Sequence, residues 1–290
     1  MTETLIHVDP EHELEDHDRG LVFDLSTLDR RQVLKGLGFA SLNVGLFTII
    51  GCGPSGATAG ASAGASAAGT AAAGTAGVGA SCAVIPEETA GPFPGDGSNG
   101  PNVLADSGVV RKDIRSSFGS STTVATGVPL TINLIVQDSG AGCAPLAGAA
   151  VYVWHCDQGG NYSLYSQAAA NENYLRGVQA ADDSGLVTFQ SIFPACYSGR
   201  WPHIHFEVYP SLEMATDENN KIATSQVALP KETCDLVYAT AGYEQSVSNL
   251  QQVSLERDMV FSDGVTQQLG TVTGTVDQGL AVALTVPVGA

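Results

Sequence analysis

The stretch Pro129-Leu-Thr-Ile-Asn-Leu-Ile-Val136 decides the fold class of this chain. Its apolar residues alternate with polar ones and many of them are β-branched, as in a strand with one buried face. Comparable short runs occur at 149–154, 203–209 and 280–286, with turn residues between them and no long helical periodicity. Many short strands separated by turns predict an all-β protein, an antiparallel or mixed β-sandwich with long loops and little helix.

Two regions between these runs carry weaker signals. Asp182-Asp-Ser-Gly185 separates strand-like runs at 177–180 and 186–189. An Asp-Ser-Gly cluster between apolar runs is typical of a tight turn, so we expect a hairpin here. Residues 231–262 are predicted to hold a short helix or long loops.

The charge balance excludes several classes of function. The 290 residues include 12 Lys and Arg against 30 Asp and Glu, a formal charge of −18, and 43% are hydrophobic, which is enough for a core. Nucleic acid and anionic lipid surfaces both require clustered Lys and Arg, so neither is expected as a partner. No apolar run reaches the ~20 residues that a membrane-spanning helix needs.

The N-terminal part predicts export. Arg30-Arg31-Gln-Val-Leu-Lys35 opens an apolar run over 36–51 and resembles a bacterial twin-arginine signal. Ile49-Ile-Gly-Cys52 resembles a lipoprotein processing site in which Cys52 becomes lipidated. Residues 53–80 are almost entirely Gly, Ala, Ser and Thr, the composition of a flexible linker.

We therefore predict three segments, namely an export signal over 1–51, a flexible tether over 52–81 and one folded domain over 82–290. The domain is expected in the periplasm or at the cell surface, held at a membrane through Cys52. A buried N-terminal helix that begins with two arginines is the alternative interpretation of the apolar run.

Three histidines fall in the predicted domain, and two of them form a pair. Side chains at i and i+2 of a strand share one face, so His203 and His205 can reach one point. Such a pair is a common half of a metal site, although two core or surface histidines are the alternative. His155 has no matching ligand role in the pattern and is expected to be structural or to support a neighbouring ligand.

Two tyrosines and an arginine are further candidate site residues. Two of these three residues lie close to the histidine pair in sequence, and the third lies in an upstream loop. The run over 194–205 contains Tyr197 and Arg200, and a Gly-rich loop after the strand at 149–154 presents Tyr162. Phenolate and imidazole donors suit a ferric ion, for which tyrosinate has precedent. Structural zinc would more often recruit cysteines, which are scattered here.

These motifs resemble those of the intradiol ring-cleavage dioxygenases, the family of the catechol and protocatechuate 3,4-dioxygenases. Trp154…Gly160-Asn-Tyr162 is similar to the first tyrosine-ligand loop of that family. Tyr197…Arg200-Trp-Pro-His203-Ile-His205 is similar to its second tyrosine, active-site arginine and histidine pair. Shorter similarities are Pro86-Glu…Gly91-Pro-Phe, Arg111-Lys-Asp-Ile114, Cys143-Ala-Pro-Leu and Arg176-Gly-Val-Gln179, so that the resemblance runs from about Cys82 to Pro230.

The resemblance implies a non-haem Fe(III) dioxygenase whose metal ligands are Tyr162, Tyr197, His203 and His205. It implies that a catechol binds iron through both oxygens and displaces Tyr197, which lies opposite His203. Cleavage of the ring between its hydroxyls by O₂ then gives a muconate-type diacid.

Two further residues have expected roles in the reaction. Arg200 would stabilise negative charge on the bound ring, and a salt bridge on the strand face is its alternative role. Gln226 is similar to a glutamine that supports the site in the family, with a hydrogen-bonded strand residue as the alternative. The predicted domain has only eight basic residues against 21 acidic ones, which favours an uncharged catechol as substrate. Family resemblance also makes a homo-oligomer possible.

Two other functions stay open at the level of sequence. One is a non-catalytic β-sandwich lipoprotein that binds a surface or carbohydrate, for which at least one of the four ligands should point away from the others. The other is an oxidative metalloenzyme that uses iron or copper for different chemistry.

Five cysteines follow Cys52, namely Cys82, Cys143, Cys156, Cys196 and Cys234. Outside the cytoplasm two disulfides would leave one thiol over. A Cys156–Cys196 pair is the hypothesis, because both residues lie beside the ligand tyrosines. A Cys143–Cys156 pair is disfavoured, because a straight strand between them would exceed disulfide reach.

Overall fold

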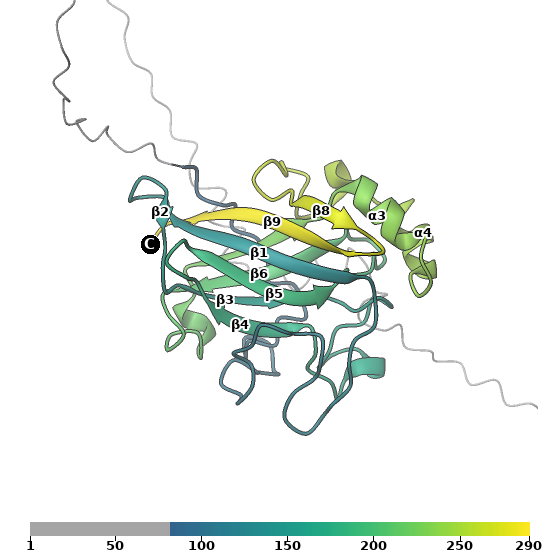
Figure 1. Ribbon diagram of the computed structural model, residues 1–290, viewed down its shortest axis with the longest axis horizontal. Helices are drawn as coiled ribbons and strands as arrows, with labels where there is room; N and C mark the ends of the chain where they lie inside the picture. Colours follow the sequence, from purple (N-terminus) through teal and green to yellow (C-terminus); the bar gives the residue numbers. More distant parts are fainter. Residues whose placement is uncertain (1–81) are drawn as a thin grey trace, which may run out of the picture. The chain divides into compact units, whose positions relative to one another are not determined.

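The computed structural model of the protein describes residues 82–290. The predicted export signal, the tether and Cys52 lie outside these residues. In the described part, no helix combines the length and the apolar character needed to cross a membrane. The predicted β-sandwich is confirmed, because this part folds into two sheets with only two short α-helices (Figure 1).

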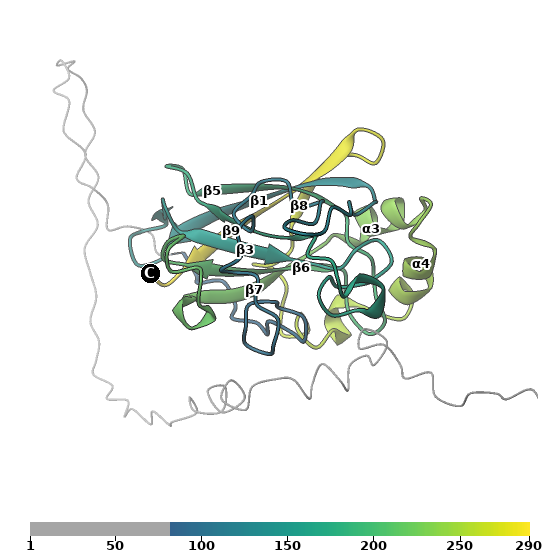
Figure 2. The same cartoon turned by 90° about the horizontal axis from the view of Figure 1, so that it is seen from below.

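The strands of residues 82–290 are, in chain order, β1 (Pro129–Asp138), β2 (Ala144–Pro145), β3 (Ala150–Trp154), β4 (Arg176–Ala180), β5 (Leu186–Ile192), β6 (His203–Tyr209), β7 (Ala223–Ala228), β8 (Thr271–Thr275) and β9 (Gly279–Val288). The α-helices are α3 (Lys231–Tyr238) and α4 (Glu244–Leu250). One sheet has the order β2-β1-β9-β8, with β5 also paired to β1. The other has the order β4-β3-β6-β7, and Figure 2 shows the sheets as two layers.

The two sheets differ in strand direction. In the five-stranded sheet, β1 runs parallel to β9, with Leu130 opposite Leu280, and antiparallel to β5, with Ile132 opposite Phe189. The four-stranded sheet is antiparallel throughout. The sandwich is therefore mixed. In the described residues, the C-terminal strand β9 pairs with β1 of the same sheet.

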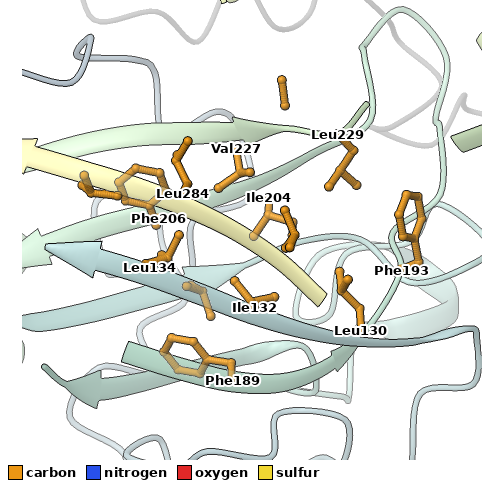
Figure 3. Close-up of a cluster of buried hydrophobic side chains, with 14 of the residues drawn as sticks. Leu130, Ile132, Leu134, Phe189, Phe193, Ile204, Phe206, Val227, Leu229 and Leu284 are labelled. Carbon is orange, nitrogen blue, oxygen red and sulfur yellow. The ribbon is translucent and has the colours of Figure 1, made fainter. Parts of the chain in front are cut away.

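The hydrophobic core fills the space between the sheets. Alternate residues of β1 are buried, as the sequence pattern predicted. Figure 3 shows Ile132 and Leu134 of β1 facing Ile204 and Phe206 of β6. Burial of each such side chain stabilises the fold by about 1.5–3 kcal/mol.

The outer face of the four-stranded sheet is buried as well, because loops cover it. All seven residues of β6 are buried. A second hydrophobic cluster on this side joins Tyr152 and Trp154 of β3 to Phe93 and Val103 from the segment before β1. Polar side chains that project from this face are therefore withdrawn from water.

The predicted hairpin at Asp182–Gly185 is wrong. β4 pairs with β3, whereas β5 pairs with β1 of the other sheet, where Leu186 lies opposite Ile135. The turn itself forms, since Gly185 has a positive φ and its N–H bonds to the Asp182 carbonyl. It connects the two layers because the apolar face of β5 packs into the core from the opposite sheet.

The predicted Cys156–Cys196 disulfide is also wrong. Cys82 is bonded to Cys143, at a sequence separation of 61. Cys156 and Cys196 are buried free thiols, whose sulfur atoms contact the carbonyl oxygens of Ala195 and Arg200 at 3.7 and 3.5 Å. Each thiol thus contacts a backbone carbonyl of the loop before β6.

Candidate metal centre

His203 and His205 are the first and third residues of β6, so both imidazoles project from the loop-covered face of the sheet. Their Nε2 atoms are 3.0 Å apart. Nδ1 of His203 donates a hydrogen bond to the Trp201 carbonyl, which turns its Nε2 toward His205. The ring of His205 stacks on that of Trp154, with centroids 4.8 Å apart. The strand therefore brings the histidine pair to one point, as expected.

Tyr162 reaches the same point from the loop after β3. An Asp157 carboxylate oxygen organises this loop by accepting hydrogen bonds from the backbone N–H groups of Gly159 and Asn161, at 2.8 and 2.9 Å. The Tyr162 ring packs against Phe93, with centroids 4.7 Å apart. Its hydroxyl oxygen lies 3.5 Å from Nε2 of His203.

Tyr197 comes from the loop before β6, which the C-terminal helices hold in place. The backbone of Cys196 bonds through its N–H to Ser246 Oγ and through its carbonyl to Asn249 Nδ2, at 3.0 and 2.8 Å. The Ala195 N–H also donates to the Asp157 carbonyl, so the two tyrosine loops are joined. The Tyr197 hydroxyl lies 3.3 Å from Nε2 of His203.

The distances from His203 Nε2 to the other three donors are close to those expected around one metal ion. These three donors lie 3.0, 3.3 and 3.5 Å from Nε2 of His203. Donors bound to one ion at about 2.0–2.1 Å are roughly 2.9–3.4 Å from each other in tetrahedral or adjacent octahedral positions. In residues 82–290 no three His, Cys, Asp or Glu side chains gather around one point, so a metal here requires the tyrosines.

Burial sets the protonation of these donors. All four side chains are at most 7% exposed. Burial, with the nearby Arg200 cation, lowers the pKa of His203 to about 3, and burial likewise lowers that of His205. Both imidazoles are thus neutral, the form that binds metals. Burial and the neighbouring Tyr197 raise the pKa of Tyr162, so its phenolate requires a cation close by.

Arg200 lies beside the donors in a fully buried network. Its Nη2 donates to Gln226 Oε1 at 2.9 Å, and its Nε donates to Asp258 Oδ2 at 3.1 Å. Gln226 lies opposite His205 in the β6–β7 register, and its Nε2 donates to the Thr89 carbonyl at 2.9 Å. Arg200 therefore forms a salt bridge, but inside the site and not on an exposed strand face.

Gly91 allows the segment before β1 to lie over the centre. Its φ is +69°, and a Cβ at this position would be 3.3 Å from Cε1 of His205. The fully buried guanidinium of Arg176 holds the same segment by donating to the carbonyls of Phe93 and Pro94 at 2.9 and 2.7 Å. The segment thus closes the site on the side that faces away from the sheet.

His155 is structural, as expected. It is buried, its Nε2 lies 2.7 Å from Ser191 Oγ and its Nδ1 lies 2.8 Å from the Cys156 carbonyl. Burial lowers its pKa to about 4, so it is neutral.

Sequence reasoning missed Asp157 and Asp258. Asp157 precedes a Gly-Gly pair, which is a turn signal that could have identified it as a loop organiser. Asp258 lies 58 residues after Arg200 in a region without a recognisable motif, and no local pattern links it to the site.

Comparisons with known proteins agree with this fold. The family model described as Dioxygenase matches residues 100–216. Chlorocatechol 1,2-dioxygenase from Rhodococcus opacus is 30% identical over 91 residues, which are 28% of this chain and 35% of that protein. The chain thus matches about a third of the length of this curated relative.

Solved structures extend the likeness to most of the described domain. An intradiol ring-cleavage dioxygenase from Tetranychus urticae superposes with a TM-score of 0.57 at 23% identity, covering 71% of this chain and 95% of that one. A second dioxygenase crystal structure gives 0.56 at 23% identity, covering 71% and 94%. At this identity the two structures establish the fold.

The fold and the matched segment relate the described all-β domain to dioxygenases of known structure. Its similarity is to the intradiol ring-cleavage dioxygenases, through the family-model match over residues 100–216 and the shared fold.

Proposed function

We propose that this protein is a non-haem Fe(III) dioxygenase that cleaves a catechol-type aromatic diol between its hydroxyls, using O₂, to give a muconate-type product. The observation that carries the proposal is the convergence of Tyr162, Tyr197 and His205 on Nε2 of His203, at 3.5, 3.3 and 3.0 Å. This convergence also argues against a non-catalytic surface-binding lipoprotein, for which one of the four side chains should point elsewhere.

Ferric iron held by Tyr162, Tyr197, His203 and His205 would bind both oxygens of a catechol and make its ring reactive toward O₂. The chain's own residues prepare the surroundings. Neutral histidines and two phenolates leave one net positive charge at the centre, which attracts a catecholate dianion. The loops that bury the donors exclude water and so strengthen that attraction.

Arg200 is the proposed catalytic cation. Its guanidinium is 1% exposed, and Gln226 and Asp258 fix its direction. A fixed donor beside developing negative charge in a dry site contributes about 3 kcal/mol to transition-state stabilisation. Tyr197 is the proposed ligand that the substrate displaces. Gln226 is proposed to hold the Arg200 guanidinium in its orientation.

The substrate is proposed to carry no carboxylate. Cations near the four-stranded sheet already have partners: Arg176 binds backbone carbonyls, and Lys221 lies 2.6 Å from Glu218 and 3.5 Å from Glu207. A carboxylate on the substrate ring would therefore have to compete with these partners for Arg176 or Lys221.

The test is purification of the full chain followed by measurement of iron and of visible absorption. We expect ferric iron at close to one ion per chain and a tyrosinate-to-iron charge-transfer colour, with both lost in Tyr162→Phe and in His205→Ala. Tyr165→Phe is the matched control, since this hydroxyl bonds to Asn99 at 2.7 Å and not to the donors. Iron-free, colourless wild-type protein would count against the proposal.

Product analysis separates intradiol cleavage from other oxidative chemistry of iron or copper. Oxygen uptake over a panel of catechols identifies the substrate. Recovery of a muconate that contains both atoms of labelled O₂ is expected, and a quinone or a singly labelled product would favour a different oxidative metalloenzyme.

Export and membrane attachment through Cys52 are also proposed, with the domain in the periplasm or at the cell surface. The Cys82–Cys143 disulfide supports an oxidising compartment. Cells fed a labelled fatty acid should label the wild-type chain but not Cys52→Ser, and Arg30→Lys together with Arg31→Lys should block export. Light scattering of the purified protein would report whether it forms a homo-oligomer.

A further inference from the structure

Asp258 is a residue of the C-terminal part of the chain whose carboxylate contacts Arg200 of the candidate site. It is 2% exposed and lies in the segment between α4 and β8, beyond the region that the family model matches. Its carboxylate accepts two bonds from Arg200, from Nε at 3.1 Å and from Nη2 at 3.4 Å. This two-point contact fixes the plane of the guanidinium as well as its position.

The Asp258 carboxylate is itself held by backbone donors. Oδ2 accepts from the Trp201 N–H at 2.7 Å, and Oδ1 accepts from the Val260 and Phe261 N–H groups at 2.9 and 3.3 Å. The Trp201 carbonyl in turn accepts from His203 Nδ1. One carboxylate thus fixes Arg200 directly and lies one peptide unit from the group that orients His203.

Burial makes such a counter-charge necessary. A guanidinium withdrawn from water without an anion is very unfavourable, and its long side chain can avoid that cost by turning outward. Gln226 provides only a neutral acceptor at Nη2. The Asp258 carboxylate supplies a counter-charge, with its Oδ2 at 3.1 Å from Arg200 Nε.

We propose that Asp258 is a positioning residue that keeps the Arg200 guanidinium directed into the catechol site. This inference rests on the proposed dioxygenase function for its effect on turnover. The contact itself does not depend on that function.

The kinetic test is a double-mutant cycle on the full iron-loaded chain with catechol as substrate. Arg200→Gln is expected to lower kcat/KM about 100-fold, the scale of one lost charge-stabilising donor. Asp258→Asn is expected to lower it about 10- to 100-fold, mainly through kcat. The double variant should match Arg200→Gln within about threefold, because Asp258 acts through Arg200. The proposal would be overturned if the two losses in kcat/KM multiplied in the double variant. It would also be overturned if kcat/KM of Asp258→Asn stayed within twofold of wild type.

Two further variants test whether a lower kcat/KM of Asp258→Asn is specific to the loss of the negative charge at this position. Asp113→Asn removes a matched Asp–Arg contact, to Arg115 at 2.6 Å, on an exposed part of the domain, and should leave kcat/KM unchanged. Asp258→Glu keeps the negative charge and should recover part of kcat. If Asp258→Asn folds poorly, the double variant lacks both charges and still tests whether removal of Asp258 adds to the Arg200 loss.

Amide hydrogen exchange separates failure of this inference from failure of the proposed function. In Asp258→Asn, peptides that cover residues 197–203 should exchange at least about tenfold faster than in wild type, and in Asp113→Asn they should not. Faster exchange in a protein that turns over no catechol would retain the positioning role and reject the dioxygenase function. Unchanged exchange would reject the positioning role whatever the activity.

Discussion

The five-stranded sheet has one face in the core and one turned toward solvent, whereas the four-stranded sheet is buried on both faces. Burial alternates along most of β9, from Leu280 to Leu284, but is continuous along β3, β6 and β7. Loops from other parts of the chain cover the second face of the four-stranded sheet, and the candidate metal donors lie under them.

The comparison separates two kinds of contribution. The side chains between the sheets are apolar, and their burial stabilises the fold without the need for hydrogen-bond partners. The covered face contains histidines, tyrosines and charged side chains that burial alone would make unfavourable. A sheet that is dry on both sides can thus stabilise the fold with Ile204 and Phe206 and position the chemistry with His203 and His205 on the same strand.

The largest effect on stability is expected from the core side of β6. Phe206→Ala should lower the free energy of unfolding by about 3–5 kcal/mol, because it leaves a cavity between the two sheets. Urea unfolding measures the change. Because Phe206 faces away from the donors, the folded fraction should still bind iron at the wild-type ratio. Loss of iron from fully folded Phe206→Ala would contradict the separation of the two faces.

The next effect concerns the covalent link beside the five-stranded sheet. Cys82→Ser with Cys143→Ser opens a loop with a sequence separation of 61 residues. In the chain-entropy model this costs about 4 kcal/mol, with measured losses of roughly 2–4 kcal/mol. Urea unfolding of the oxidised protein and the double variant checks this. Cys156→Ser with Cys196→Ser is the matched control for the covalent link, and should leave the number of disulfides unchanged.

Local patterns predicted the strands well but not their partners. The alternation of β1 from Leu130 to Val136 is visible in the sequence because only one face is buried. The turn at Asp182–Gly185 is equally visible, yet whether the next strand folds back or crosses to the other sheet depends on core packing. The same limit explains the wrong disulfide, since the approach of Cys82 to Cys143 depends on the whole sandwich.

The site was predictable to the extent that its residues lie in short motifs. His203 and His205 share a strand, and the loops of Tyr162 and Tyr197 follow the spacing of a known family. Asp258 has no such local signature, because its link to Arg200 spans the α-helices and most of the C-terminal region. Contacts of that range appear only when the chain is folded.

A smaller effect is expected from the loop that presents Tyr162. Asp157→Ala leaves the Gly159 and Asn161 N–H groups without their acceptor and should cost about 1–2 kcal/mol. Asp182 forms a similar turn, with Ser184 and Leu186, away from the donors and on the crossover between the sheets. Asp182→Ala is therefore the matched control. Iron content and urea midpoints of Asp157→Ala and Asp182→Ala compare the two loops. Only Asp157→Ala should release iron, and equal iron retention would remove Asp157 from the support of the centre.

The smallest effect lies where the segment before β1 joins the two sheets. The Ile85 N–H bonds to Pro287 of β9, and the Glu88 N–H bonds to Thr224 of β7, both at 2.8 Å. Burial raises the pKa of Glu88 to about 7, although Gln268 donates to its carboxylate at 3.1 Å. The folded state therefore binds the Glu88 proton more tightly than the unfolded state, so the contribution to stability is complete below pH 4.5 and is lost as pH rises through 7. Glu88→Gln should stabilise the protein by roughly 1 kcal/mol at pH 8 and leave it unchanged at pH 4.5, as measured by urea unfolding at both pH values. An equal gain at both pH values would mean that ionisation of Glu88 does not weaken the join between the sheets.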